Sequence, residues 1–221
     1  MCAMLQTKTS GDRPQCPPTL PGFEHIKHYW DDKHQVYAAH IMPGEFFVST
    51  ANEIITTVLG SCISACIRDV EAGVGGMNHF MLPGDETSPT SGACLSTSAR
   101  YGTYAMEQMI NIILNHGGKR ERLEIKLFGG GKVLQAMTDI GSRNIQFVRD
   151  YLHMESLLVT SEDLGGLHPR KVLYFPGTGR VLMRKLLLSQ DEKVGQRELQ
   201  YQNKLEHTPI IAGEIDLFKK K

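Results

Sequence analysis

Short apolar runs separated by turn residues fill the first half of the chain after about residue 35. Each run is three to nine residues long, and most are rich in β-branched or aromatic side chains, which is typical of strands. The predicted strands are Val36 to Met42, Phe46 to Val48, Glu53 to Leu59, Ile63 to Arg68 and Val74 to Leu82. Turn signals at Pro43-Gly44, at Gly60 and from Glu71 to Gly73 separate them. This half of the chain is therefore predicted to be a β meander.

The second half of the chain mixes helical and strand-like periods. Apolar residues recur every three or four positions from about Thr97 to His116 and again from Ser142 to Met154, which predicts two amphipathic helices. Further strands are predicted at Glu124 to Phe128, Leu157 to Thr160, Lys171 to Phe175 and Arg180 to Leu187. Together these elements predict an α+β fold: a layered α/β sandwich with mixed, largely antiparallel sheets and two main helices.

The two ends of the chain differ from its middle. Residues 1–34 contain four prolines and little periodicity, which predicts a flexible or loosely docked N-terminal arm. Residues 189–221 are polar and end in three lysines, which predicts a solvated C-terminal extension, with a docking strand or a partner contact as the alternative. The folded domain is therefore assigned to residues 35–188.

Composition and charge exclude several classes of protein. The chain has 221 residues, of which 41% are hydrophobic and 22% charged, as expected of one globular domain with tails. Because 24 basic residues balance 24 acidic ones, binding to nucleic acid or to an anionic membrane is disfavoured. No apolar run approaches the roughly 20 residues that span a bilayer, and residues 1–10 lack a signal-peptide core. The sequence predicts a cytoplasmic protein without direct membrane insertion.

The cysteines point to thiol chemistry or burial rather than to disulfides. The chain contains an odd number of them, namely Cys2, Cys16, Cys62, Cys66 and Cys94. A domain of this size in a reducing compartment needs no disulfide framework. Each cysteine is therefore a buried thiol, a metal ligand or a nucleophile.

Cys62 has the most informative surroundings. A free cysteine has a pKa of about 8.5 and is mostly protonated at neutral pH. A reactive thiolate therefore needs a nearby imidazole or a cluster of amide groups. His79 on the next predicted strand can supply the imidazole, and Gly60 permits a sharp turn that aims the amides of Ser61 and Cys62 at a developing oxyanion. A hydroxyl such as that of Thr56 can accept a hydrogen bond from the second imidazole nitrogen and fix the tautomer.

A zinc site is the alternative interpretation of the same residues. Cysteine and histidine are good zinc ligands, and the candidate set is Cys62, Cys66, His79 and Cys94. Four residues along a strand span roughly 13 Å, whereas two thiolates on one zinc lie close together. Only a turn between Cys62 and Cys66 would allow this site, and the sequence predicts a strand there.

The order of motifs resembles a known family. The segment T-x-V-L-G-S-C-x-x-x-C-x-x-D, followed by G-G-M-N-H-F-M-L-P, is similar to the chemoreceptor glutamine deamidases of bacterial chemotaxis, the CheD family. The likeness covers roughly Val36 to Leu187. It continues through Arg100-Tyr101-Gly102, Phe128 to Gly131, Ile140 to Asn144 and Asp163 to Gly166.

The resemblance implies an α/β layered fold related to bacterial toxin deamidases and a Cys-His-Thr triad. In this family the threonine lies six residues before the cysteine and the histidine seventeen after it, which selects Thr56, Cys62 and His79. Thr57 is the adjacent alternative, because neighbouring strand residues face opposite ways and only one can meet His79. Gly60 and Ser61 are the expected oxyanion-binding residues.

The implied activity is the conversion of receptor glutamine to glutamate by a protein-glutamine glutaminase that needs no metal or organic cofactor. The implied substrate is the helical cytoplasmic domain of methyl-accepting chemoreceptors, and a chemotaxis phosphatase is a further possible partner. The same thioester chemistry would also hydrolyse receptor glutamate methyl esters. A non-catalytic protein that regulates receptors or a phosphatase by binding alone is the second hypothesis.

Overall fold

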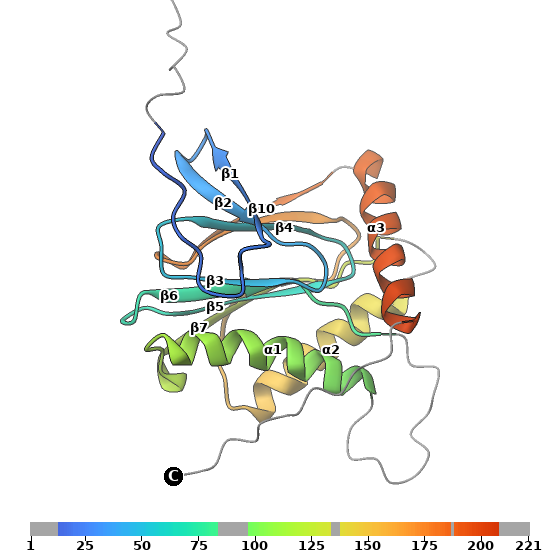
Figure 1. Ribbon diagram of the computed structural model, residues 1–221. Coiled ribbons are helices and arrows are strands. Elements are labelled where there is room, and N and C mark those ends of the chain that lie inside the picture. Colours follow the sequence, from blue (N-terminus) through green and yellow to red (C-terminus); the bar gives the residue numbers. More distant parts are fainter. Residues whose placement is uncertain (1–12, 84–96, 134–137, 187, 208–221) are drawn as a thin grey trace, which may run out of the picture.

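The computed structural model describes residues 13–83, 97–133, 138–186 and 188–207. Two five-stranded sheets pack face to face, two helices cover the outer face of one sheet, and a third helix stands across one end of the sheets (Figure 1). The predicted α+β sandwich is confirmed. None of the helices in these ranges is long and apolar enough to cross a membrane.

The first sheet has the strand order β1-β2-β4-β9-β10. Its strands are β1 (Lys27–Asp31), β2 (Val36–His40), β4 (Ile54–Leu59), β9 (Arg170–Phe175) and β10 (Arg180–Lys185). All neighbours are antiparallel except β2 and β4, which run parallel. The central strand β4 turns Ile55 and Leu59 into the core, so the side chain of Thr57 between them faces the second sheet.

The second sheet has the order β3-β6-β5-β7-β8 and lies between the first sheet and the helices (Figure 1). Its strands are β3 (Phe46–Ser49), β5 (Ile63–Asp69), β6 (Val74–Asn78), β7 (Leu123–Gly129) and β8 (Val159–Leu164). Only β7 and β8 are parallel. Because β5 is central and covered on both faces, its residues form an almost continuously buried run.

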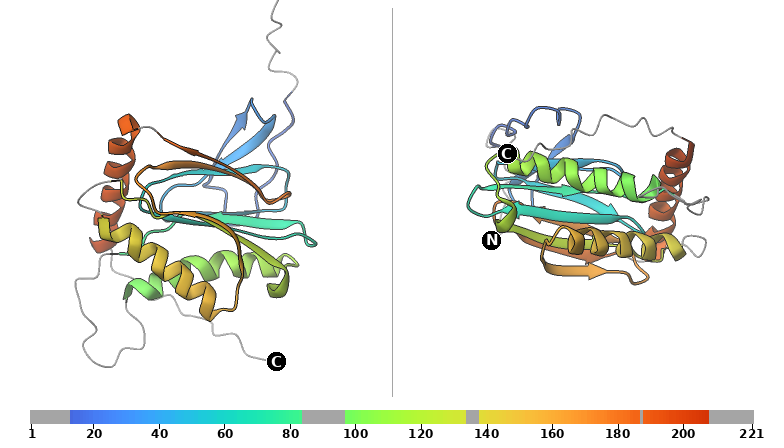
Figure 2. Two further views of the ribbon diagram at one scale, coloured as in Figure 1. Left: turned by 180° about the vertical axis from the view of Figure 1, so that it is seen from behind. Right: turned by 90° about the horizontal axis from the view of Figure 1, so that it is seen from below.

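Two helices, α1 (Thr97–Asn115) and α2 (Thr138–Met154), pack side by side on the second sheet (Figure 2). Each buries the apolar stripe that predicted it, including Met109 and Ile113 in α1 and Val148 in α2. Both predicted helices are confirmed, although α2 begins four residues before the predicted start. A short 3₁₀ turn, Arg120–Arg122, leads from α1 into β7.

The structure differs from the predicted boundary at residue 35. Strand β1 pairs with β2 along its whole length, and Phe23 and Ile26 ahead of it are buried. Phe23 packs edge-on against Phe46 and Phe47. Residues 23–31 are thus held by an aromatic contact and a strand pairing that the proline-rich composition of the segment does not predict.

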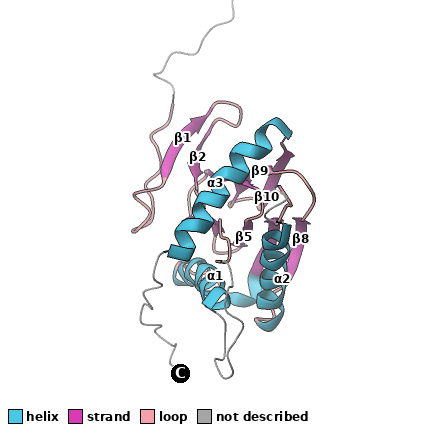
Figure 3. Ribbon diagram, turned by 90° about the vertical axis from the view of Figure 1, so that its right-hand side faces the viewer, coloured by secondary structure: helices cyan, strands magenta, loops and turns pink. Residues whose placement is uncertain are grey.

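The structure also differs over the C-terminal extension. A helix, α3 (Leu188–His207), forms where the sequence predicts a solvated tail, and it crosses the end of both sheets (Figure 3). On its inward side Gly195 and Glu198 are buried, and Val194, Tyr201 and Leu205 are half-buried. The lysines and the apolar cluster near the C-terminus lie outside the described residues.

Candidate active site

A bridge between β5 and the segment after β6 brings the predicted cysteine and histidine together. Ile63 and Phe80 exchange two backbone hydrogen bonds of 2.9 Å. In an antiparallel register, the residues that precede such a pair, here Cys62 and His79, are diagonal neighbours on one face. The Sγ of Cys62 lies within 4.8 Å of a ring nitrogen of His79, and both side chains are buried between the sheets.

A threonine hydroxyl fixes the orientation and tautomer of His79. The Oγ1 of Thr57 lies 2.7 Å from Nδ1 of His79 and donates its own hydrogen to the carbonyl of Ile41 at 2.8 Å. Thr57 therefore accepts a hydrogen bond from Nδ1–H, which leaves Nε2 as the basic nitrogen. This Nε2 is buried and has no hydrogen-bond partner among the described residues. The imidazole is thus set up as a proton acceptor.

The prediction that Thr56 contacts His79 is wrong. The hydroxyl of Thr56 donates to the carbonyl of Val172 at 2.9 Å, within the first sheet. Successive side chains alternate across a strand, and Thr57 is the one that faces the second sheet. Spacing along the chain identified the right pair of threonines but not the face on which each lies.

The loop Gly60–Cys62 is held from behind through its carbonyl groups. In chain order, the three carbonyls accept hydrogen bonds from Gly131 N–H at 2.7 Å, from the side-chain amide of Asn144 at 2.9 Å and from Gly130 N–H at 2.8 Å. The Oδ1 of Asn144 also accepts from the N–H of Leu82 at 2.9 Å. Because every carbonyl is tied down on one side, the three N–H groups of the loop point to the other side, toward the site.

The glycine turn after β7 makes this backing possible. Gly129 has φ of +115°, and a Cβ at that position would lie 2.1 Å from the carbonyl oxygen of Cys62. Only glycine allows the two backbones to approach so closely. The turn from Gly129 to Gly131 thus supports the cysteine loop.

The three N–H groups converge on one carboxylate, that of Glu198 from α3. One oxygen accepts from Gly60 N–H at 2.7 Å and from Cys62 N–H at 3.3 Å, and the other accepts from Ser61 N–H at 2.6 Å and Ser61 Oγ at 2.7 Å. A Cβ on Gly60 would lie 2.6 Å from this carboxylate, so the glycine leaves room for it. The loop is an anion site of the kind that stabilises a tetrahedral oxyanion.

Sequence reasoning selected Gly60 and Ser61 for the oxyanion site but missed Glu198 and Asn144. Glu198 lies in a polar segment with no motif, and nothing in its local sequence marks it as buried. Asn144 stands in one of the segments that carry the family resemblance, so its motif was visible, but its contact with Ser61 spans 83 residues. Contacts of this range depend on the fold rather than on a local pattern.

Burial keeps both reacting groups neutral in this conformation. Burial raises the pKa of the Cys62 thiol well above its ordinary value, and the negative charge of Glu198 raises it further. Burial also lowers the pKa of His79 to about 3, and the charges of His40 and Arg197 add to that effect. The thiol therefore keeps its proton while α3 is in place.

The ligand-type side chains in the site are Cys62, His79 and Glu198, which offer one atom each within 4.8 Å of one another. Both oxygens of Glu198 already accept backbone N–H bonds, which is the chemistry of an oxyanion site. Cys66 is not in this cluster, since it lies farther along the extended strand β5, and Cys94 lies outside the described residues. The four-residue zinc set is thus not assembled around Cys62 and Cys66.

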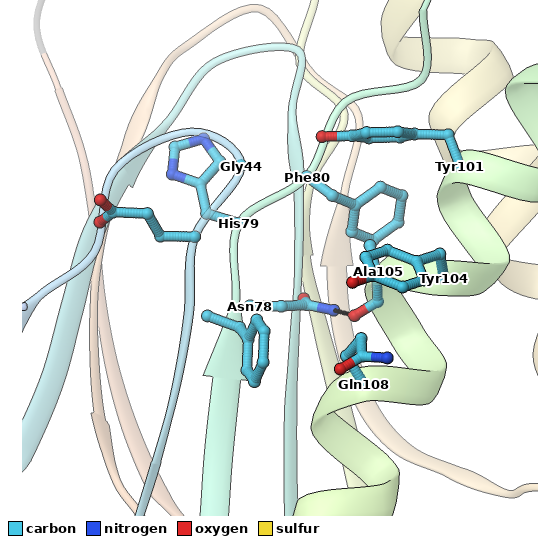
Figure 4. Close-up of a pocket in the computed structure, with 10 residues that line it drawn as sticks. Gly44, Asn78, His79, Phe80, Tyr101, Tyr104, Ala105 and Gln108 are labelled. Atoms are coloured by element: carbon cyan, nitrogen blue, oxygen red, sulfur yellow. Dashed lines mark hydrogen bonds between the residues drawn. The ribbon is translucent and has the colours of Figure 1, made fainter. Parts of the chain in front are cut away.

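A small cavity reaches the site from the side of α1 (Figure 4). His79 lies on one wall, and Tyr101 and Tyr104 of α1 lie on the other. The hydroxyl of Tyr101 is 2.6 Å from the hydroxyl of Tyr201 in α3. The start of α1 and the inward face of α3 thus cover the cysteine and histidine together.

Comparison with known proteins identifies the family. The family model described as CheD chemotactic sensory transduction matches residues 81–185. A protein of Halorhodospira halophila named probable chemoreceptor glutamine deamidase CheD is 53% identical over 204 residues, which are 91% of this chain and 94% of the relative.

Proteins with the same name in Hahella chejuensis and Saccharophagus degradans are also similar to the chain. The first is 47% identical over 93% of this chain and 97% of the relative, and the second is 46% identical over 97% and 100%. Identities of this size over nearly full length mean that the fold is shared. The chain belongs to the CheD family.

Proposed function

We propose that this chain hydrolyses the side-chain carboxamide of glutamines on methyl-accepting chemoreceptors, which converts them to glutamate residues and releases ammonia. The observation that carries the proposal is the buried thiol of Cys62 next to an imidazole whose far nitrogen is fixed by Thr57, with three N–H groups converging beside it. The names of the relatives supply the substrate class, since they are described as probable chemoreceptor glutamine deamidases.

The first half of the reaction forms a thioester. Nε2 of His79 takes the proton of the Cys62 thiol, and the thiolate attacks the carboxamide carbon of the substrate glutamine. The oxygen of the carboxamide becomes an oxyanion, which accepts hydrogen bonds from the N–H groups of the loop Gly60–Cys62. The imidazolium then donates its proton to the leaving nitrogen, and ammonia departs as the C–N bond breaks.

The second half of the reaction returns the enzyme to its starting state. A water molecule gives a proton to Nε2 of His79 and attacks the thioester carbon, and the same N–H groups hold the second oxyanion. The C–S bond breaks, the Cys62 sulfur regains a proton, and the product is a glutamate side chain. Thr57 acts throughout by holding the imidazole in one tautomer.

The proposed substrate is the helical cytoplasmic part of the receptor, so the proposed place of action is the cytoplasm. Each conversion adds one negative charge to the receptor helix. A chemotaxis phosphatase as a second partner stays a prediction from the family resemblance.

The test is to incubate the purified chain with a receptor cytoplasmic fragment and to follow ammonia release and glutamine-to-glutamate conversion by peptide mass. We expect Cys62→Ala to abolish conversion. Cys66→Ala is the matched control, because Cys66 is also a buried thiol of the same segment but lies outside the site. Conversion by Cys62→Ala would reject the nucleophile, and receptor binding without conversion by the unaltered chain would favour the non-catalytic regulator.

A further inference from the structure

The carboxylate of Glu198 occupies the position that the side-chain carboxamide of the substrate would take in the proposed reaction. It accepts three backbone N–H bonds and one hydroxyl bond from the loop Gly60–Cys62, and it lies within 4.8 Å of the Cys62 sulfur and of a His79 ring nitrogen. A glutamate side chain presented by a helix is also the chemical product of deamidating a glutamine on a helix. Glu198 and that product therefore share the same functional group, the same side-chain length and a position on a helix.

Few of the described side chains of α3 are buried. Glu198 is buried, and Val194, Tyr201, Gln202 and Leu205 are half-buried. The hydroxyl of Tyr201 lies 2.6 Å from that of Tyr101. Leu199 is 41% exposed, and the helix as a whole is polar. A helix that buries so few of its side chains belongs to the parts of a protein that open most readily.

We infer that α3 is an internal product mimic, which closes the site by placing the Glu198 carboxylate in the oxyanion-binding loop and which a substrate helix must displace. The identity of the displacing helix rests on the proposed function, whereas the closed state does not. Two carboxyl-type groups cannot accept from the same three N–H groups, so α3 and substrate exclude each other.

The electrostatics of the closed state support this inference. The charge of Glu198 adds to burial in raising the pKa of Cys62, and Arg197 on the same helix adds to burial in lowering the pKa of His79. Both effects disfavour the thiolate–imidazolium pair that begins the reaction. Departure of α3 would expose the thiol and remove both charges at once.

Alkylation of Cys62 tests the closed state without any substrate. The full chain is treated with iodoacetamide, and labelling of each cysteine is followed by peptide mass. We expect Glu198→Ala to label at Cys62 at least about tenfold faster than the unaltered chain, the factor that corresponds to losing one charge-assisted hydrogen bond. Leu199→Ala, one position along the same helix and exposed, should leave the rate unchanged.

Cys66 is the internal reference for folding, because it is buried in β5 away from α3. Faster labelling of Cys62 alone supports the inference. An unchanged Cys62 rate in Glu198→Ala, or an equal rise in Leu199→Ala, overturns it. If Glu198→Ala also speeds labelling of Cys66, the variant Tyr201→Phe is used instead, because it removes only the hydroxyl contact with Tyr101. Faster labelling of Cys62 alone in Tyr201→Phe then supports the inference, and an unchanged labelling rate of Cys62 overturns it.

Glu198→Gln tests the product position itself. If α3 presents position 198 as a product, the new carboxamide should be hydrolysed within the same chain, and the peptide should gain the mass of an amide-to-acid conversion. The double variant Cys62→Ala with Glu198→Gln should keep the amide. Absence of conversion in a protein that deamidates receptor glutamines overturns the product position.

The two proposals fail in different ways. If Glu198→Ala exposes Cys62 but no glutamine is converted on receptor or on α3, then the closed state holds and the deamidase function fails. If receptor glutamines are converted but the labelling rate of Cys62 is the same in Glu198→Ala as in the unaltered chain, then the deamidase function holds and the internal mimic fails.

Discussion

The two ends of β5 each gather buried polar groups, and they satisfy them in different ways. At the far end, the buried carboxylate of Asp69 accepts N–H bonds from Ala72 at 3.0 Å and from Lys119 at 2.7 Å, and it pairs with Arg122 at 2.6 Å. These partners come from the following turn and from the loop that leads into the neighbouring strand. All of them are parts of the sheet or of its immediate connections, so this cluster stabilises the fold.

At the near end, the N–H groups of the loop Gly60–Cys62 have no partner within the sheets that the structure describes. Their acceptor is Glu198, at least 136 residues away on a helix that buries few of its described side chains. Polar groups that hydrogen-bond to the sheet and its connections contribute to stability. N–H groups whose acceptor lies on a helix that can move away are available for binding and catalysis. The difference separates a structural cluster from a site on one and the same strand.

The largest effect that would sharpen this comparison is expected at His79. His79→Gln keeps a polar side chain but removes the basic nitrogen, so we expect the deamidation rate to fall by about 10² to 10⁴, the usual contribution of general acid–base catalysis. The rate is measured by peptide mass on a receptor fragment. His40→Gln is the control, since the interaction of His40 with His79 is electrostatic, and a comparable loss there would contradict the assignment.

A somewhat smaller effect is expected at Asn144, which holds the cysteine loop through the Ser61 carbonyl. Asn144→Ala removes the partner of the Ser61 carbonyl and of the Leu82 N–H. A displaced loop should lower kcat by about 10²-fold, because misplacement by a single ångström has such effects. Gln146→Ala, exposed on the same helix, is the control. An Asn144→Ala enzyme with unchanged kcat would show that the loop holds its shape without this clamp.

The sequence predicted those parts of the molecule that depend on local periodicity. The strands around Cys62 and His79 and the helices α1 and α2 all have apolar patterns that match their final surroundings. The pairing of Cys62 with His79 also follows from adjacent strands joined by a short turn. This level of reasoning needs contact between neighbours in sequence, and the hairpin of β5 and β6 provides it. The predicted meander of the first half is otherwise wrong, because β2 pairs in parallel with β4 in one sheet and β3 pairs with β6 in the other.

The sequence could not predict the groups that meet across long separations. Thr56 and Thr57 have the same side chain, and only the sheet in which β4 packs decides which one faces His79. The sequence of α3 predicts a solvated tail because its inward side mixes two apolar residues, Val194 and Leu205, with a glycine, a glutamate and a tyrosine instead of forming an apolar face. Burial of Glu198 is favourable only because the cysteine loop offers it N–H groups, and this complementarity has no local signature.

The structural end of β5 should respond in stability and not in activity. Burial alone would raise the pKa of Asp69, but hydrogen bonds from Ala72 N–H, Arg122 and Lys119 N–H lower it to about 2. Because its pKa is lower in the folded protein, the ionised carboxylate stabilises the fold at pH values above its unfolded pKa of about 3.9. This contribution is lost as the pH falls toward about 2. We expect Asp69→Asn to lower the free energy of unfolding by about 2 kcal/mol at pH 7.

Denaturant unfolding between pH 7 and pH 2 measures this contribution. The unaltered chain should lose stability as the pH falls from about 4 to about 2, and Asp69→Asn should lose less over that window. The deamidation rate of the folded variant should equal that of the unaltered chain. A lowered rate in fully folded Asp69→Asn would mean that the two ends of β5 are coupled.

The smallest effect, and the finest distinction, concerns the two threonines of β4. Thr57→Val removes the acceptor of His79 Nδ1–H and frees the imidazole to adopt the other tautomer. We expect the deamidation rate to fall by about five- to tenfold, the equivalent of a net hydrogen bond of about 1 kcal/mol. Thr56→Val loses a bond of similar length, to the Val172 carbonyl, but on the opposite face of the strand. It should lower stability without lowering the rate, and the reverse result would restore Thr56 as the partner of the catalytic imidazole.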